Sequence, residues 1–160
     1  MPVGNFEKID IVPLIKSTVE LFGQHEEISF EVQYPNEAYE VLGDKNQIIR
    51  VFTNIIKNSV QAIPENTEGK IKIDFSKTEK DCLISIFDNG TGIPEDKRDK
   101  IFEPNFTTKS SGTGLGLAIC KNTIERMEGK IWFVSKEGEY TIFYLQCPIV
   151  TGKQIGRAHV

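Results

Sequence analysis

Hydrophobic residues recur every three or four positions in three stretches of the chain, a spacing that predicts amphipathic helices. The longest helix is expected over residues 45–63, and the other two over residues 11–22 and 115–127. Asp10 and Asp44 stand directly before two of these stretches, where a carboxylate can accept hydrogen bonds from the first helical N–H groups. Each predicted helix therefore has one apolar side that must be buried against another layer.

Between the helices, shorter apolar runs are bounded by turn-forming residues, and this pattern is typical of β-strands. Strands are expected over residues 28–34, 40–42, 70–76, 82–88, 130–135 and 140–147. A helix does not separate each pair of strands, which argues against a doubly wound parallel sheet. The pattern predicts the α+β class: a two-layer α/β sandwich in which about five strands form a mixed, mostly antiparallel sheet, with three helices on one face.

The composition is that of an ordinary globular domain. The chain has 160 residues, of which 39% are hydrophobic and 26% charged. The net charge of −4 gives no reason to expect a nucleic-acid or membrane partner. No apolar run approaches the ~20 residues that cross a bilayer, and no signal peptide begins the chain. We expect a cytoplasmic, monomeric domain over residues 1–150 and a disordered tail over residues 151–160.

Three cysteines, Cys82, Cys120 and Cys147, lie far apart in the sequence and in apolar surroundings. A zinc site would need closely spaced cysteines and histidines, and that spacing is missing. The pattern predicts buried, reduced thiols.

Two asparagines, Asn54 and Asn58, are one turn apart on the longest predicted helix. Residues at i and i+4 leave the same side of a helix, so both amides can face one cavity while the opposite side packs on a sheet. An amide oxygen is a neutral, hard ligand that suits Mg²⁺ bound together with phosphates. The alternative is that both asparagines are solvated surface positions.

A first glycine-containing turn, Asp88-Asn89-Gly90-Thr91-Gly92, follows an apolar strand directly. A carboxylate at the end of such a strand is expected to be partly buried and to need a hydrogen-bond donor, such as the exocyclic amine of adenine. The glycines permit a sharp turn and the close approach of a flat base. A plain turn between two strands is the alternative.

A second glycine-rich segment leads into the third predicted helix, whose first turn has no acidic residue. Its glycines are Gly112, Gly114 and Gly116, and Ser110, Ser111 and Thr113 add hydroxyl donors. Free N–H groups at a helix start favour a phosphate. The segment is not a dinucleotide fingerprint, because no parallel βαβ unit precedes it, and it is not a P-loop, because Gly-Lys-Ser/Thr is absent. A flexible linker is the alternative.

These segments and a fourth stand in one order along the chain: residues 54–58, 88–92, 102–106 and 112–117. The order resembles the N, G1, F and G2 boxes of bacterial sensor histidine kinases, and Phe106-Thr-Thr-Lys109 resembles their nitrogen-regulation branch. The resemblance covers nearly the whole chain. It implies the Bergerat α/β sandwich, which is shared with gyrases, mismatch-repair ATPases and ninety-kilodalton heat-shock chaperones.

The resemblance also implies ATP and Mg²⁺ as cofactors. By it, Asn58 is the Mg²⁺ ligand with Asn54 beside it, and Asp88 accepts a hydrogen bond from adenine. Asn54, Lys57 and Lys109 are the implied catalytic residues, the two lysines as phosphate-side cations. Further nucleotide-binding residues implied by the resemblance are Gly90, Gly92, Ile93, Phe102, Thr108, Gly112, Thr113, Gly114, Leu115, Gly116, Leu117 and Thr141. Residues 93–111 would form a lid over the nucleotide.

Position 54 bears on the reaction. ATP-hydrolysing members of this superfamily carry a glutamate there, whereas an asparagine amide cannot accept a proton at neutral pH. We therefore expect slow hydrolysis and transfer of the γ-phosphoryl group to a histidine held elsewhere, on a dimerisation helical hairpin, with a response regulator downstream. His25 and His159 do not lie in predicted helices. The chain is thus expected to be an isolated catalytic domain; the alternatives are an anti-sigma-type serine kinase and a nucleotide-binding switch without catalysis.

Overall fold

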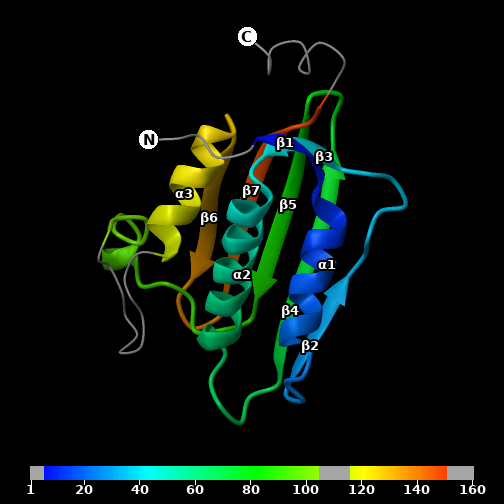
Figure 1. Cartoon of the computed structure of the whole chain (residues 1–160). Helices are drawn as coiled ribbons and strands as arrows, with labels where there is room; N and C mark the ends of the chain where they lie inside the picture. Colours follow the sequence, from blue (N-terminus) through cyan, green and yellow to red (C-terminus); the bar gives the residue numbers. More distant parts are fainter. Residues whose placement is uncertain (1–5, 105–115, 151–160) are drawn as a thin grey trace.

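The computed structural model describes residues 6–104 and 116–150, which fold into two layers (Figure 1). Helix α2 lies between α1 and α3, and all three helices cover the same face of the main sheet (Figure 1). In chain order the elements are β1 (Glu7–Asp10), α1 (Ile11–Phe22), β2 (Ile28–Val32), β3 (Glu40–Gly43), α2 (Lys45–Ala62), β4 (Gly69–Lys77), β5 (Asp81–Asp88), the 3₁₀ turn η1 (Glu95–Lys97), α3 (Gly116–Arg126), β6 (Lys130–Lys136) and β7 (Tyr140–Pro148).

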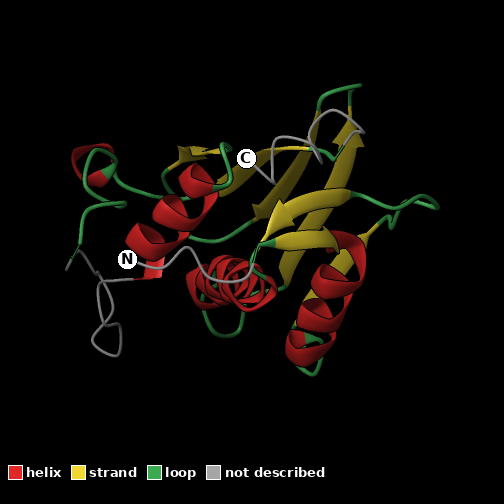
Figure 2. Cartoon of the chain, turned by 45° about the horizontal axis from the view of Figure 1, so that its top comes forward, coloured by secondary structure: helices red, strands yellow, loops and turns green. Residues whose placement is uncertain are grey.

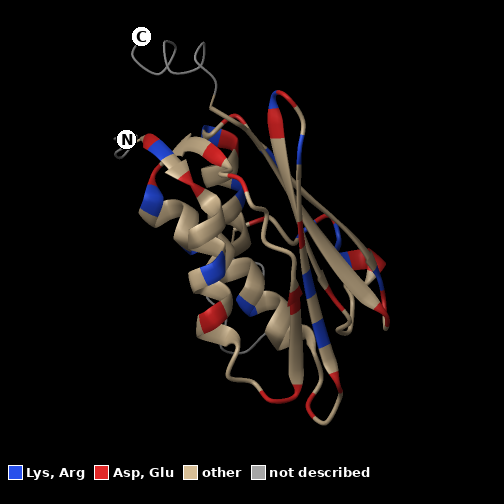
Figure 3. Ribbon diagram, turned by 90° about the vertical axis from the view of Figure 1, so that its right-hand side faces the viewer, with Lys and Arg blue, Asp and Glu red and all other residues tan. Residues whose placement is uncertain are grey.

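The main sheet has five strands in the order β2-β4-β5-β7-β6. Strands β2 and β4 are parallel, and the other three pairings are antiparallel. The three helices and the five-stranded sheet form two separate layers in the tilted and the side views (Figures 2 and 3). The predicted α/β sandwich with a mixed, mostly antiparallel sheet is confirmed.

Two short elements were not predicted, and one predicted strand lies elsewhere. Strand β1 pairs with β3 in a separate two-stranded sheet, so β3 does not belong to the main sheet. Strand β1 is four residues long and buries only Ile9, which is too little for an alternating pattern. The turn η1 is three residues long and has no buried residue.

The two predicted capping aspartates are present. The Asp10 carboxylate accepts hydrogen bonds from the N–H groups of Val12 and Tyr39, both at 3.1 Å. Asp44 caps α2 through the N–H groups of Asn46 and Gln47, at 2.9 and 3.1 Å. Each cap contributes about 1 kcal/mol to helix stability, and Asp10 also ties the start of α1 to the segment before β3.

The inner side of α2 packs on the sheet as its apolar spacing predicts. Its buried residues are Ile48, Val51, Phe52, Ile55, Ile56 and Ser59. Val60, which was expected on this side, is only half-buried, and the serine before it takes the inner position. No helix in the described ranges 6–104 and 116–150 has the length and apolarity needed to cross a membrane.

The three cysteines are reduced and buried, as predicted. Cys82 and Cys147 lie opposite each other on β5 and β7, and Cys120 lies on α3. Desolvation raises the pKa of Cys82 to about 11 and that of Cys120 to about 12, and it also raises the pKa of Cys147. The folded state therefore favours the neutral thiol at all three positions.

These thiols should be almost unreactive toward iodoacetamide at pH 8 in the folded protein, because the thiolate is the nucleophile. All three should react in guanidinium chloride, and mass spectrometry would count the adducts. Because burial raises each thiol pKa above the ordinary value of 9.0, folding stability should be independent of these groups below that pH and should decline as the pH rises above it. Rapid alkylation of one cysteine in the folded protein would contradict the prediction.

Candidate nucleotide site

Asp88 ends strand β5 beneath the helix layer. Its side chain is 1% exposed, and its Oδ1 accepts a hydrogen bond of 2.9 Å from the N–H of Gly90. On the adjacent strand β7 it faces Thr141, which is 3% exposed. A carboxylate can accept several hydrogen bonds, so this one can support the turn and still receive a donor from a ligand. The strand end thus combines a buried acceptor with a buried hydroxyl.

The turn after Asp88 runs between two parts of the protein's own backbone. A Cβ at Gly90 would lie 2.5 Å from the carbonyl oxygen of Ala62, at the end of α2. Gly92 has a φ of +72°, and a Cβ there would collide with the carbonyl oxygen of Lys136. Both glycines are therefore required by contacts within the protein. Close approach of a base to Gly92 stays a prediction.

The asparagine pair lies on α2. Asn54 and Asn58 are half-buried and one turn apart, whereas Lys57 between them is exposed. The first residue of α3, Gly116, lies beside Asn54: a Cβ on this glycine would be 3.6 Å from the Asn54 amide carbon. Asn54 also hydrogen-bonds the thiol of Cys120, one turn further along α3. The structure therefore brings Asn54 to the N-terminal end of α3.

Two predicted residues hold the segment that leaves the strand end against the sheet edge. The N–H of Ile93 donates to the Ser135 hydroxyl at 2.8 Å. The ring of Phe102 packs against Phe133 and Phe143, with ring centroids 6.0 and 6.4 Å apart. Leu117 on α3 is half-buried against the same core. These residues contribute packing around the site.

The remaining predicted residues lie outside the described residues. They are Thr108, Lys109, Gly112, Thr113, Gly114 and Leu115. The same holds for most of the predicted phosphate loop and for part of the predicted lid over residues 93–111.

Two serines in the site were not predicted. Ser59 directly follows Asn58, is 1% exposed, and its hydroxyl has no hydrogen-bond partner among the described residues. Ser135 on β6 forms three hydrogen bonds close to Thr141. The sequence did contain a signal for Ser59, because a serine on the apolar side of a helix is a polar group in a position expected to be buried. The second gains its place only through the register of β6 and β7, which the sequence does not reveal.

The arrangement fits a nucleotide with its metal. A buried carboxylate suits an amine on a base, and two half-buried amides suit a hydrated cation. The first turn of α3, beside Asn54, has no acidic residue and so favours phosphate oxygens. The orphaned Ser59 hydroxyl adds a buried polar atom next to Asn58 that a ligand or its water can satisfy.

Comparison with known proteins defines the class. Residues 43–151 match the family of histidine kinase-, DNA gyrase B-, and HSP90-like ATPases. The chain belongs to this family, and the predicted class of ATP-binding domain is confirmed.

Relatives and solved structures point to one branch of the family. The chain is 38% identical to sporulation kinase C of Bacillus subtilis over 107 residues, which are 67% of this chain and 24% of that protein. It is 34% identical to sensor histidine kinase ZraS of Escherichia coli K12, over 89% of this chain and 31% of ZraS. It is likewise 34% identical to nitrogen regulation protein NtrY of Azorhizobium caulinodans, over 82% of this chain and 18% of NtrY.

Among solved structures, the chain is similar to the nucleotide-free catalytic domain of histidine kinase ThkA. The identity is 35%, the TM-score is 0.79, and the match covers 91% of this chain and 96% of that domain. The chain therefore spans less than a third of the length of each of these three relatives but nearly all of a kinase catalytic domain.

Proposed function

We propose that the chain is the catalytic domain of a sensor histidine kinase, which binds ATP with Mg²⁺ and transfers the γ-phosphoryl group to a histidine on a dimerisation helical hairpin. The observation that carries the proposal is the convergence of three elements: the buried Asp88 at the end of β5, the asparagine pair on α2, and the N-terminal end of α3 beside Asn54. The likeness to an entire kinase catalytic domain supports it.

Each element has one task in this proposal. Asp88 accepts a hydrogen bond from the exocyclic amine of adenine, with Thr141 beside it. The amide oxygen of Asn58 binds Mg²⁺ or its waters, and Asn54 orients the same hydration shell. Bound Mg²⁺ neutralises phosphate charge and orients the γ-phosphoryl group. Lys57 and Lys109 add positive charge on the phosphate side, and the first N–H groups of α3 receive phosphate oxygens.

The amide at position 54 favours transfer to an incoming nucleophile over hydrolysis. An amide cannot take a proton from water at neutral pH, so Asn54 cannot act as a general base that activates a water to attack bound ATP. An imidazole is a nucleophile without such help. His25 lies in the turn between α1 and β2, is exposed, and is not on a helix, which supports an acceptor histidine on another domain.

A response regulator is the proposed next acceptor of the phosphoryl group. The chain is 31% identical to histidine kinase ThkA in its complex with the response regulator protein TrrA, with a TM-score of 0.74 over 91% of this chain and 42% of that one. The identity to NtrY supports the nitrogen-regulation-like branch. A histidine-bearing hairpin supplied in trans should accept phosphate from this chain, and its labelling tests the transfer step.

Replacement of Asn58 tests the metal site. In Asn58→Ala, the gain in ATP affinity that Mg²⁺ provides should fall by about tenfold or more. The cation loses the amide oxygen as a ligand, and a water that replaces it is not held in place by the protein. ATP affinity would be measured by calorimetry with Mg²⁺ and with EDTA.

Asn46→Ala is the matched control, since Asn46 is exposed in the first turn of the same helix. It should leave both affinities unchanged. An unaltered Mg²⁺ dependence in Asn58→Ala would reject Asn58 as the ligand.

A further inference from the structure

The hydroxyl of Ser135 joins three groups at the edge of the candidate nucleotide site. It accepts a hydrogen bond from the N–H of Ile93 at 2.8 Å and donates to the carbonyl oxygen of Tyr140 at 2.9 Å. It also lies 2.9 Å from the hydroxyl oxygen of Thr141. Ser135 and Thr141 are register partners on β6 and β7, so the sheet holds this distance.

One assignment of protons satisfies all three contacts. A serine hydroxyl has one proton and two lone pairs. The N–H of Ile93 can only donate, and the carbonyl of Tyr140 can only accept, so the single proton of Ser135 is used on Tyr140. The contact with Thr141 is then a hydrogen bond only if Thr141 donates. The Thr141 hydroxyl therefore donates its hydrogen bond to Ser135 and can only accept hydrogen bonds from its other neighbours.

This orientation has a consequence for base recognition. Asp88, the register partner of Thr141 on its other side, is a carboxylate acceptor. Two acceptors side by side match the exocyclic amine of adenine, which carries two donors. Guanine has an acceptor oxygen at the corresponding position, and that oxygen would meet two acceptors. Leaving such groups unpaired in a buried site is costly, so the pair discriminates between the two bases.

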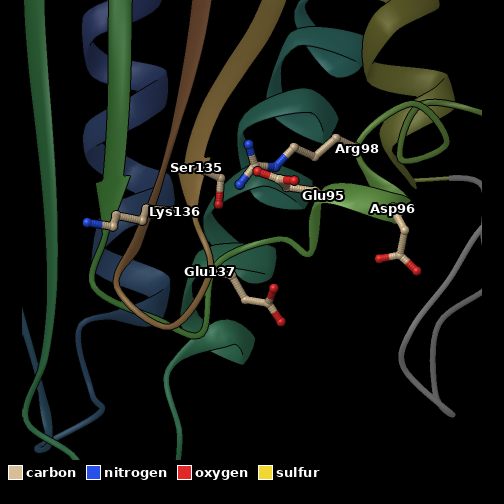
Figure 4. A pocket seen from close by; sticks show the side chains of 6 residues that line it. All are labelled: Glu95, Asp96, Arg98, Ser135, Lys136 and Glu137. Carbon is tan, nitrogen blue, oxygen red and sulfur yellow. The ribbon is translucent and has the colours of Figure 1, made fainter.

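The same serine also fixes the start of the segment that leaves the turn. The carbonyl oxygen of Ile93 accepts a hydrogen bond of 3.1 Å from Nε of Arg98, so this residue is held at both its N–H and its C=O. Figure 4 shows Arg98 reaching toward Ser135 in a cleft of about 560 Å³ between η1 and the β6–β7 turn. The remaining residues lining it are Glu95, Asp96, Lys136 and Glu137.

We propose that Ser135 is a positioning residue that determines base specificity: it orients the Thr141 hydroxyl as an acceptor and fastens Ile93 at the edge of the site. The inference rests on the proposed binding of adenine at Asp88 and Thr141. Without Ser135, the Thr141 hydroxyl can rotate and donate outward, which suits guanine as well as adenine.

The test compares ATP and GTP affinities, measured by calorimetry, in the unsubstituted chain, Ser135→Ala and Ser135→Thr. Ser135→Ala should weaken ATP binding by about tenfold and leave GTP binding unchanged or tighter, so the preference for ATP falls by at least that factor. Ser135→Thr keeps a hydroxyl at this position of the strand and should retain the preference for ATP over GTP. Ser29→Ala, on the exposed side of β2, is the matched control and should change neither affinity.

A double-mutant cycle and hydrogen exchange separate orientation from packing. If Ser135 acts through the Thr141 hydroxyl, Ser135→Ala should have little further effect on ATP preference in a Thr141→Val background. Exchange of the Ile93 amide should be faster in Ser135→Ala. If Ser135→Ala does not fold, the ratio of ATP to GTP affinity can be measured in Ser135→Cys instead, because the cysteine side chain is of similar size and donates only weak hydrogen bonds.

The outcomes distinguish this inference from the proposed function. An unsubstituted chain that does not bind ATP, or binds ATP and GTP equally, would overturn the proposed base site itself. An ATP-selective chain in which Ser135→Ala keeps its preference, or loses affinity equally for both nucleotides, would overturn only the role of Ser135.

Discussion

Asp88→Asn should lower the affinity for ATP by one to two orders of magnitude while the fold is retained. The asparagine oxygen can still accept the hydrogen bond from the Gly90 N–H that shapes the turn. The other side-chain atom becomes an NH₂ group, which presents a donor to the donor amine of adenine. Such a buried mismatch costs ~1–3 kcal/mol, which corresponds to roughly 5- to 150-fold in the dissociation constant.

Calorimetric titration with ATP and GTP would measure this loss, and circular dichroism would check the fold. Asp74→Asn is the matched control, because it makes the same chemical change away from the site. Asp74 is exposed on the neighbouring strand β4. Asp74→Asn should leave ATP affinity unchanged. Wild-type affinity in Asp88→Asn would remove Asp88 from the base site.

The helices and most strands could be predicted because their residues carry the pattern locally. In α2, five apolar residues recur at helical spacing and all are buried on the sheet. The capping aspartates act on N–H groups two or three residues ahead, so their role is also visible in the sequence. Interactions of this range depend on neighbours along the chain, and a single sequence contains them.

The strand pairings that escaped prediction depend on distant partners. Strand β3 pairs with β1 rather than with the main sheet, and β2 pairs in parallel with β4 across an intervening helix. An apolar run indicates that a strand exists, but it does not indicate which strand lies beside it.

The same division holds in the site. Burial of Asp88 was predicted from the apolar strand before it, and the structure places this carboxylate at 1% exposure. The contacts that require glycine at positions 90 and 92 come from Ala62 and Lys136, which are far away in sequence. Ser135 was missed for this reason also, since its hydroxyl matters only once Thr141 lies opposite.

The largest effect is expected when the chain meets an acceptor histidine. Alone, the chain should bind ATP, hydrolyse it very slowly and not label itself, because position 54 is an amide and His25 lies in a turn. A histidine-bearing helical hairpin added in trans should become labelled from γ-labelled ATP. The label should be lost in acid and kept in base, as the P–N bond of a phosphohistidine requires.

The controls for this assay follow from the residues of the site. A hairpin with its histidine replaced by glutamine should stay unlabelled, and the Asn58→Ala chain should label the intact hairpin far more slowly. Asn54→Glu should raise ATP hydrolysis, since a carboxylate can take a proton from water where the amide cannot. Stable labelling of the chain alone that disappears in His25→Gln would overturn the transfer to another domain. Acid-stable labelling of a serine on a partner protein would assign the chain to the anti-sigma type of kinase instead.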